Sequence, residues 1–327
     1  MSKSSSVTKR LTAGLAFAAA ALLASACGSS STTSTTTAAG GGSTTSAPTT
    51  TAAPTTTSTT APAVPTAQKD AKLAGEVPSA IKSKGTITVA ADATYAPDEF
   101  IAADGHTVVG MDADLSTAIG QVLGLKVNMV NATFDTIIPG LTDGKYDMGA
   151  SSFTDTLARQ KQVDFVTYFT AGEAFYTSKG SSIKITSLGS ICGLSVAVET
   201  GTTEESDAKT QSTKCTSKGQ KAVKVLSFAN QNSANLAVSS GRAQAGFLDS
   251  QIAAYVVAQS NGQFALNGPT VNSAPYGLAL PKGNGMAAPV LGAVKSLMAS
   301  GIYLDILKKW GVESGAITNP AINGATS

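Results

Sequence analysis

Histidine, cysteine and tryptophan are scarce in this chain of 327 residues, which has one histidine, three cysteines and one tryptophan. The only histidine, His106, lies in a polar turn, so the sequence offers neither a Cys/His metal cluster nor a Ser/His/Asp or Cys/His catalytic set. The turn at 282–285 also lacks the spacing of a phosphate-binding loop. We therefore expect no metal, no cofactor and no catalytic residue.

Charged residues are also few, at 13% of the chain. The net charge of +2 comes from Lys3, Lys9 and Arg10, because residues 69–327 hold 20 Lys and Arg against 21 Asp and Glu, a net charge of −1. Such a balance provides no basic surface for nucleic acid or for an anionic membrane. We expect no nucleic-acid partner.

Long apolar runs are absent except near the N-terminus. Residues 11–23 form a 13-residue apolar core after three basic residues, too short to cross a bilayer of about 30 Å with margin. The core ends in the sequence ASACG, which resembles a bacterial lipobox with Cys27 as the lipidated residue. Residues 1–26 are predicted to be a signal peptide, and the mature protein a lipoprotein anchored to the outer face of the bacterial cell membrane. The alternative is ordinary cleavage after Ala26 with a free Cys27.

Residues 28–68 contain no charged residue and consist almost entirely of Ser, Thr, Ala, Gly and Pro. Such a segment cannot bury enough apolar surface to fold. We expect residues 27–68 to be a lipidated, disordered tether with a root-mean-square reach of roughly 35 Å.

The other two cysteines, Cys192 and Cys215, have 22 residues between them in a chain expected to be exported. This context favours a disulfide, which contributes roughly 3 kcal/mol on the chain-entropy model. Two free thiols are the alternative.

Strand and helix patterns alternate along the rest of the chain. Strands are expected at 86–90, 126–130, 146–150, 194–198, 223–226, 245–248 and 276–280. Helices are expected between them, one with apolar positions at the 3.6-residue period from Leu115 to Leu123 and ended by Gly124, and two more close the domain through Trp310. This alternation predicts an α/β protein with mostly parallel sheets in two units, a cleft between them and ligands at the carboxyl ends of strands.

A run of hydroxyl side chains precedes a single arginine, Arg159. Thr154, Asp155 and Thr156 are residue types that cap helices, so a helix is expected to begin there, with Arg159 in its first turns. A helix N-terminus, free hydroxyls and a guanidinium at one place suit a carboxylate ligand. An ordinary surface arginine is the alternative.

Seven short motifs, in order, make the chain resemble family 3 of the bacterial extracellular solute-binding proteins, the amino-acid-binding components of ABC importers. The resemblance covers residues 75–324 and rests on DATYAP (92–97), GMDADL (110–115), FDTIIP (134–139), the run at 140–169, VETGTT (198–203), GRAQAGFLD (241–249) and YGLALPKG (276–283). One departure is Asp98 after Pro97, where many relatives have an aromatic residue.

The resemblance implies a two-lobed periplasmic-binding-protein fold of type II with the ligand in the cleft. Lobe 1 is expected to comprise residues 69–170 and 275–327, and lobe 2 residues 171–274. The two crossings between lobes are expected near 168–172 and 273–276.

The resemblance also implies roles for individual residues. Arg159 would clamp the ligand α-carboxylate, Asp249 would accept from its α-ammonium, and Tyr95 and Phe134 would sandwich its side chain. Asp92 would lie toward the side-chain tip. The predicted ligand-binding set is Asp92, Tyr95, Phe134, Ser151, Ser152, Thr154, Arg159, Glu199, Thr202, Thr203 and Asp249.

Each role has a structural alternative. Asp249 would cap the following helix, Phe134 would belong to the core, and Tyr95 would be a surface aromatic. Thr202 and Thr203 would be helix caps alone. Glu199 would turn outward or pair with a lysine.

The predicted function is to bind a polar, in particular cationic, amino acid and to deliver it, as a monomer, to an ABC permease and its ATPase. Asp92 and Glu199 near the distal pocket favour arginine, lysine or ornithine over glutamine. Two alternatives are an enzyme of the cyclohexadienyl dehydratase type and a sensor module.

Overall fold

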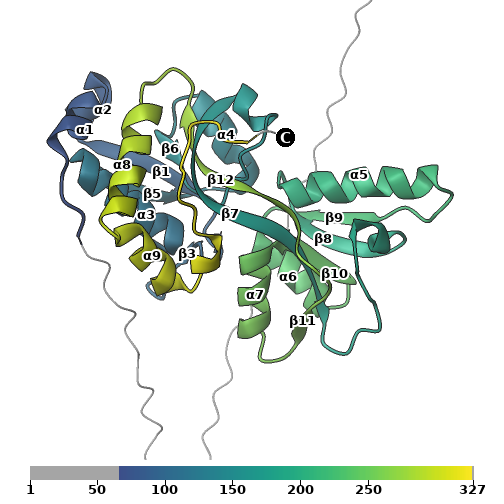
Figure 1. The fold of residues 1–327 in the computed structure, drawn as a ribbon. Coiled ribbons are helices and arrows are strands. Elements are labelled where there is room, and N and C mark those ends of the chain that lie inside the picture. The colour runs from purple at the N-terminus through teal and green to yellow at the C-terminus, as the bar shows by residue number, and fades with distance from the viewer. Residues whose placement is uncertain (1–65, 326–327) are drawn as a thin grey trace, which may run out of the picture. The chain divides into compact units, whose positions relative to one another are not determined.

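The computed structural model describes residues 66–325, which Figure 1 shows as a ribbon. The predicted signal peptide at 1–26, Cys27 and nearly all of the tether at 27–68 lie outside the described residues. Within 66–325, no single helix is long and apolar enough to cross a membrane, although α8 (Ala287–Ala299) and α9 (Ile302–Trp310) reach that length and composition as a pair bent by 80°.

Nine strands form one mixed sheet in the order β5-β1-β6-β12-β7-β10-β8-β9, and β11 pairs with β7. Strand β1 runs parallel to β5 and β6, and β8 runs parallel to β9 and β10. These parallel groups confirm the α/β class. The strands are β1 (Thr86–Ala91), β5 (Lys126–Asn131), β6 (Met148–Gly149), β7 (Val163–Ser178), β8 (Ser195–Glu199), β9 (Lys224–Phe228), β10 (Ala245–Asp249), β11 (Phe264–Leu266) and β12 (Val271–Pro281).

A small antiparallel sheet accompanies the large one, with the order β2-β3-β4. Its strands are β2 (Thr94–Tyr95), β3 (Glu99–Ile101) and β4 (Val108–Val109). None of the three was expected from the sequence pattern, because each is only two or three residues long.

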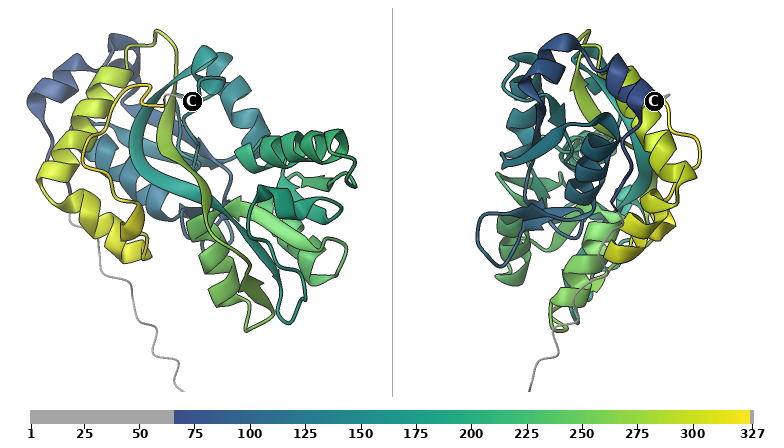
Figure 2. Two further views of the ribbon diagram at one scale, coloured as in Figure 1. Left: turned by 45° about the vertical axis from the view of Figure 1, so that its right-hand side comes forward. Right: turned by 90° about the vertical axis from the view of Figure 1, so that its left-hand side faces the viewer.

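Two groups of helices cover the two halves of the large sheet, as Figures 1 and 2 show. One group lies around β5, β1 and β6: α1 (Ala71–Glu76), α2 (Ser79–Lys84), α3 (Met111–Leu123), α4 (Phe134–Thr142), α8 and α9. The other lies around β10, β8 and β9: α5 (Thr203–Ser217), α6 (Gln231–Ser239) and α7 (Ser250–Gln259). The fold is therefore two-lobed.

Strands β7 and β12 run through both halves. They pair antiparallel from Val163↔Pro281 to Glu173↔Val271, with register shifts between. The segments expected to be simple crossings, 168–172 and 273–276, are thus parts of paired strands, and the two expected sheets are hydrogen-bonded into one. The assignment of 69–170 with 275–327 and of 171–274 to separate lobes stays a prediction.

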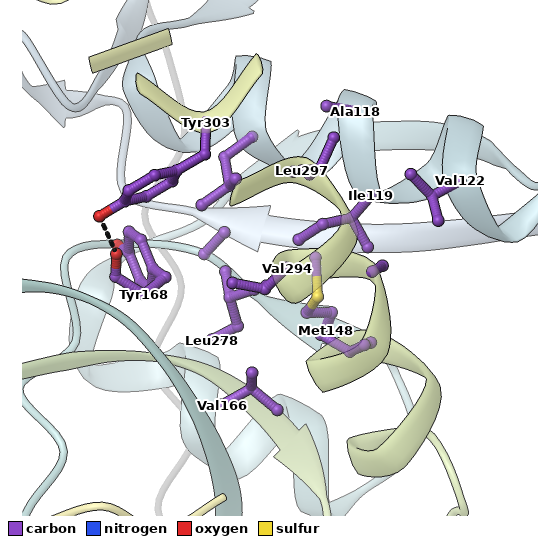
Figure 3. Packing of buried hydrophobic residues seen from close by; sticks show 14 of the residues in the cluster. Ala118, Ile119, Val122, Met148, Val166, Tyr168, Leu278, Val294, Leu297 and Tyr303 are labelled. Atoms are coloured by element: carbon purple, nitrogen blue, oxygen red, sulfur yellow. Dashed lines mark hydrogen bonds between the residues drawn. The ribbon is translucent and has the colours of Figure 1, made fainter. Parts of the chain in front are cut away.

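The core of the first lobe is built on α3. Leu115 and Ile119 are about 1% exposed, and Gly124, at a φ of 69°, ends the helix as expected. Leu115 and Ile119 belong to one buried cluster with Val294 and Leu297 of α8. Figure 3 shows part of this cluster, together with the hydrogen bond from the Tyr303 hydroxyl of α9 to the Tyr168 carbonyl of β7. Each such aliphatic side chain stabilises the fold by about 1.5–3 kcal/mol.

The predicted disulfide is confirmed. Cys192 and Cys215 are bonded, with their Cα atoms 5.7 Å apart. Cys192 follows the 3₁₀ helix Leu188–Ile191, just before β8, and Cys215 lies in the last turns of α5. The disulfide therefore joins α5 to the segment before β8.

The expected helix at 154–156 is wrong. Thr154 forms an isolated bridge with Tyr276, and only a 3₁₀ turn, Arg159–Lys161, follows. Asp155 is engaged elsewhere, because it accepts hydrogen bonds from Gln160 Nε2 at 2.7 Å and from the backbone N–H of Ala325 at 3.1 Å. Thr156 caps only the short turn, by accepting from the backbone N–H of Arg159 at 3.2 Å. The segment 154–156 therefore supplies no helix N-terminus beside Arg159, and the helix N-terminus at this place is that of α5, whose cap Thr202 follows the Gly201 carbonyl that Arg159 binds.

Candidate functional site

One pocket collects every residue of the predicted ligand-binding set. It is lined by Asp92, Tyr95, Glu99, Phe134, Ser151, Ser152, Thr154, Arg159, Glu199, Thr202, Thr203, Glu204 and Asp249. Eleven of these thirteen were predicted, and the sequence reading missed Glu99 and Glu204. Most of the lining side chains are less than 10% exposed.

The topology of the large sheet explains this convergence. Asp92 follows β1, Ser151 follows β6 after one residue, and Glu199 and Asp249 end β8 and β10. These four strands belong to the two parallel groups, and their carboxyl ends face the pocket. This is the usual ligand position in open α/β sheets.

Arg159 bridges the two sides of the pocket. Its Nη1 donates to the Thr154 carbonyl at 2.8 Å, and its Nη2 donates to the Gly201 carbonyl at 3.0 Å. The guanidinium carbon lies 5.4 Å from the ring centre of Phe134 and 5.5 Å from that of Phe153. Two of its five N–H groups are therefore engaged, and three are left for a ligand.

The loop before α5 passes very close to the first lobe. Gly201 has a φ of 83°, and a Cβ at this position would lie 2.9 Å from the Cβ of Asp135. Thr202 caps α5 by accepting from the backbone N–H of Glu205 at 3.2 Å, as the alternative reading held, and it also lines the pocket.

Asp92 and Glu199 form one acidic pair of the pocket. Asp92 accepts from Thr94 Oγ1 at 2.7 Å and from the backbone N–H of Phe134 at 3.0 Å. Burial, and then the neighbouring Asp92, raises the pKa of Glu199 to about 10. Glu199 Oε1 has no hydrogen-bond partner within the described part of the chain.

Asp249 and Tyr95 form a second polar contact across the pocket. The Tyr95 hydroxyl donates to Asp249 Oδ2 at 2.8 Å. Burial raises the pKa of Asp249 to about 7. The side chain of Asp249 makes no capping hydrogen bond to α7, so the simple capping role is not seen. Tyr95 is 6% exposed and is therefore no surface aromatic.

A network of three buried carboxyls lies beneath Ser152, which has an unusual φ of 48°. The backbone N–H of Ser152 donates to Asp112 Oδ2 at 3.0 Å, and its Oγ lies 3.1 Å from oxygens of both Asp98 and Glu99. Burial raises the pKa of Asp98 to about 8 and that of Asp112 to about 6. The network holds the serine in a backbone conformation that costs on the order of 1–3 kcal/mol.

The departure at Asp98 gains a structural meaning here. Its carboxyl is fully buried, and Asp98 Oδ2 accepts from Gln251 Nε2 of α7 at 2.8 Å. The position that many relatives fill with an aromatic residue thus links the two lobes by a polar contact. Among the described residues, no group of three or more His, Cys, Asp or Glu has an arrangement that could hold a metal ion.

Comparison with known proteins places this site in a family. A model described as bacterial extracellular solute-binding proteins, family 3, matches residues 87–313. The arginine-binding protein ArgT of Corynebacterium glutamicum is 31% identical over 248 residues, which cover 76% of this chain and 81% of that protein.

Two solved structures have the same fold. An ancestral arginine-binding protein bound to arginine is 37% identical with a TM-score of 0.64, over 69% of this chain and 98% of that one. The ancestral amino acid-binding protein AncCDT-1, a precursor of cyclohexadienyl dehydratase, is 34% identical with a TM-score of 0.64, over 71% and 97%. The chain therefore belongs to family 3 of the bacterial extracellular solute-binding proteins.

Proposed function

We propose that this protein is the substrate-binding component of an ABC importer and that it binds a basic amino acid, arginine above others, in the pocket between its lobes. It delivers this ligand to a permease and its ATPase. The observation that carries the proposal is the pocket, in which one arginine and several carboxyls face the same small volume. Family membership supports the role in transport.

Arg159 is the group suited to the ligand α-carboxylate. Its three remaining N–H groups match a carboxylate in the planar, two-pronged manner that favours arginine. The hydroxyls of Thr154 and Thr203, whose Oγ1 atoms lie 3.4 Å apart, stand on opposite lobes beside it. Asp249 is suited to the α-ammonium because it is the acidic group that Tyr95 fixes across the pocket.

The ligand class follows from unsatisfied oxygens. Among the described residues, Glu199 Oε1 and Glu204 Oε1 are buried without a hydrogen-bond partner, and both side chains line the pocket. A buried acceptor left without a donor costs about 1–3 kcal/mol, and more when it is charged. Arginine carries two cationic groups with many N–H donors. ArgT and the arginine-bound ancestral protein support the same choice for this chain.

Calorimetry on the purified protein tests the ligand. We expect arginine to bind most tightly, followed by lysine and ornithine, with glutamine weaker and glutamate weakest. Asp92→Asn should weaken arginine binding at least tenfold, whereas Asp143→Asn on the exposed surface should leave it unchanged. Tightest binding of glutamate would contradict the acidic pocket.

We also propose that the protein is not an enzyme, despite its likeness to a dehydratase precursor. Five carboxyls line the pocket, and they disfavour a prephenate-like acid, which carries two carboxylates. Incubation with prephenate should therefore yield no turnover above the rate without protein. Steady-state turnover that Arg159→Ala abolishes would establish catalysis instead.

The lipid anchor and the monomeric state complete the proposal. Cys27 is the membrane attachment that the sequence predicts, so Cys27→Ala should release the protein from the membrane fraction. Continued membrane association after alkaline washing would contradict the anchor. Light scattering of the purified protein should give the mass of one chain.

A further inference from the structure

Glu204 is one of the two pocket residues that were not predicted from the sequence, and the predicted roles leave it unused. It is the second residue of α5 and is 1% exposed. Its Oε2 accepts from Thr203 Oγ1 at 3.2 Å, whereas within 66–325 its Oε1 has no partner. A buried carboxylate oxygen that lines a ligand pocket without a donor points to a donor on the ligand.

Several charged and titratable groups face Glu204 from the surrounding elements. Arg159 attracts it from the 3₁₀ turn, and Asp249 on β10 repels it. Glu173 on β7, the direct strand partner of Asp249, also interacts with it unfavourably, as do Glu199 on β8 and Tyr95 on β2. Contacts place Glu204 at the end of the pocket that holds Arg159: Thr203 Oγ1, which donates to Glu204, lies 3.4 Å from Thr154 Oγ1, and Arg159 binds the Thr154 carbonyl.

Glu204 is expected to have two opposite effects on a bound amino acid. Its carboxylate attracts the ligand α-ammonium and repels the ligand α-carboxylate that Arg159 would bind. The geometry favours attraction. One oxygen of Asp249 already accepts from the Tyr95 hydroxyl at 2.8 Å. An ammonium has three N–H donors, and the unpaired Glu204 Oε1 adds an acceptor for them beside Asp249.

We propose that Glu204 is a second anionic acceptor for the ligand α-ammonium, beside Asp249, and that it makes the ammonium a requirement for binding. This inference rests on the proposed amino-acid function. It adds a specificity-determining residue: ligands that keep the ammonium are favoured, and analogues that lack it leave two buried carboxyls without a cation. Such missing partners discriminate strongly between ligands.

The test combines Glu204→Gln with three ligands and measures dissociation constants by calorimetry. Arginine has both α-groups, agmatine keeps the ammonium without the carboxylate, and 5-guanidinopentanoate keeps the carboxylate without the ammonium. We expect the variant to lose roughly 10- to 100-fold in affinity for arginine and agmatine, the range for a charge-assisted hydrogen bond. Its affinity for 5-guanidinopentanoate should change by less than about threefold. Unchanged or improved arginine affinity overturns the proposal.

Proton release gives a second readout that a merely structural role would not produce. Burial, and then Asp249, raises the pKa of Glu204 well above its usual value. The free protein therefore favours the protonated form of Glu204 more than a free carboxyl does, and an arriving ammonium favours its ionised form and so promotes proton release. Calorimetry in buffers of different ionisation enthalpy should show more release on arginine binding in the wild type than in Glu204→Gln. Equal release, or proton uptake, contradicts the proposal.

Asp207→Asn is the matched control, because Asp207 lies on the same helix and does not line this pocket. It should leave all three affinities within about twofold, since a screened charge outside the pocket contributes little. Failure of the wild type to bind any basic amino acid would refute the proposed function itself. Normal arginine binding with an unaffected Glu204→Gln would refute only the role of Glu204.

Discussion

Replacing Glu199 by glutamine is expected to stabilise the free protein and to weaken ligand binding at the same time. Burial, and then Asp92, raises the pKa of Glu199 from the ordinary 4.5 to about 10. The folded protein therefore keeps a proton on Glu199 at pH 7, whereas the unfolded chain has released it. Because the pKa of Glu199 is higher in the folded protein than in the unfolded chain, the free energy of unfolding falls as the pH rises from about 4.5 toward 10.

The magnitude follows from the distance between pH 7 and the unfolded pKa. About two and a half pH units, at about 1.36 kcal/mol each, give a cost of roughly 3 kcal/mol at pH 7. Glutamine has the shape of the protonated glutamate and cannot ionise, so Glu199→Gln removes this cost. The melting temperature should rise by roughly 5–10 °C at pH 7 and hardly at all at pH 4.5.

Ligand binding should respond in the opposite direction. A ligand cation interacts with ionised Glu199 but only weakly with a neutral amide, so arginine affinity should fall by about 1.5–3 kcal/mol. Urea unfolding from pH 4.5 to 8 and calorimetry at pH 7 measure the two effects on the same samples. The reasoning would be refuted if Glu199→Gln had a lower free energy of unfolding than the wild type at pH 7 and kept the same pH dependence as the wild type.

Four further predictions concern single contacts. Arg159→Lys keeps the charge but loses the fork, so calorimetry should show arginine affinity at least tenfold weaker; an unchanged value would mean the clamp is misassigned. Asp249→Asn should cost about 2–5 kcal/mol of binding, and near-wild-type affinity would place the α-ammonium elsewhere. Cys192→Ser should lower the free energy of unfolding by about 3 kcal/mol in urea titrations, against no change if the bond is dispensable. Gln251→Ala should accelerate arginine dissociation in stopped-flow experiments by a few-fold while the ligand-free melting temperature stays the same; an unaltered rate would show that the contact with Asp98 does not hold the lobes together.

Local patterns predicted the elements whose stability is local. Helix α3 followed from the apolar period that ends at Gly124, and the parallel strands followed from short apolar runs between turns. The long strands β7 and β12 did not follow, because their identity depends on pairing between segments about a hundred residues apart. The helix expected at Thr154 did not form for a related reason: the Thr154 backbone bridges to the distant Tyr276, and Asp155 accepts from the distant backbone N–H of Ala325.

The pocket was predicted through motif resemblance more than through chemistry. Spacing alone could not bring Asp92, Glu199 and Asp249 together, because each follows or ends a different strand. Glu204 was missed because two adjacent glutamates at the start of a helix suit the helix dipole. The rotation of α5 about its axis points the two side chains in different directions. Glu204 lines the pocket, whereas Glu205 accepts hydrogen bonds from Lys209 and Ser227.

The charge balance of the pocket links its stability to its specificity. Five carboxyls line it against one arginine, and a largely buried pocket does not keep four uncompensated charges. Burial raises the pKa of Asp92, Glu199 and Glu204, that of Glu199 to about 10, which favours protonated carboxyls in the free protein. On the proposed function, a basic amino acid would supply cations to these carboxyls in place of protons, whereas a neutral amino acid would not. We therefore expect arginine binding to strengthen as the pH rises toward 8.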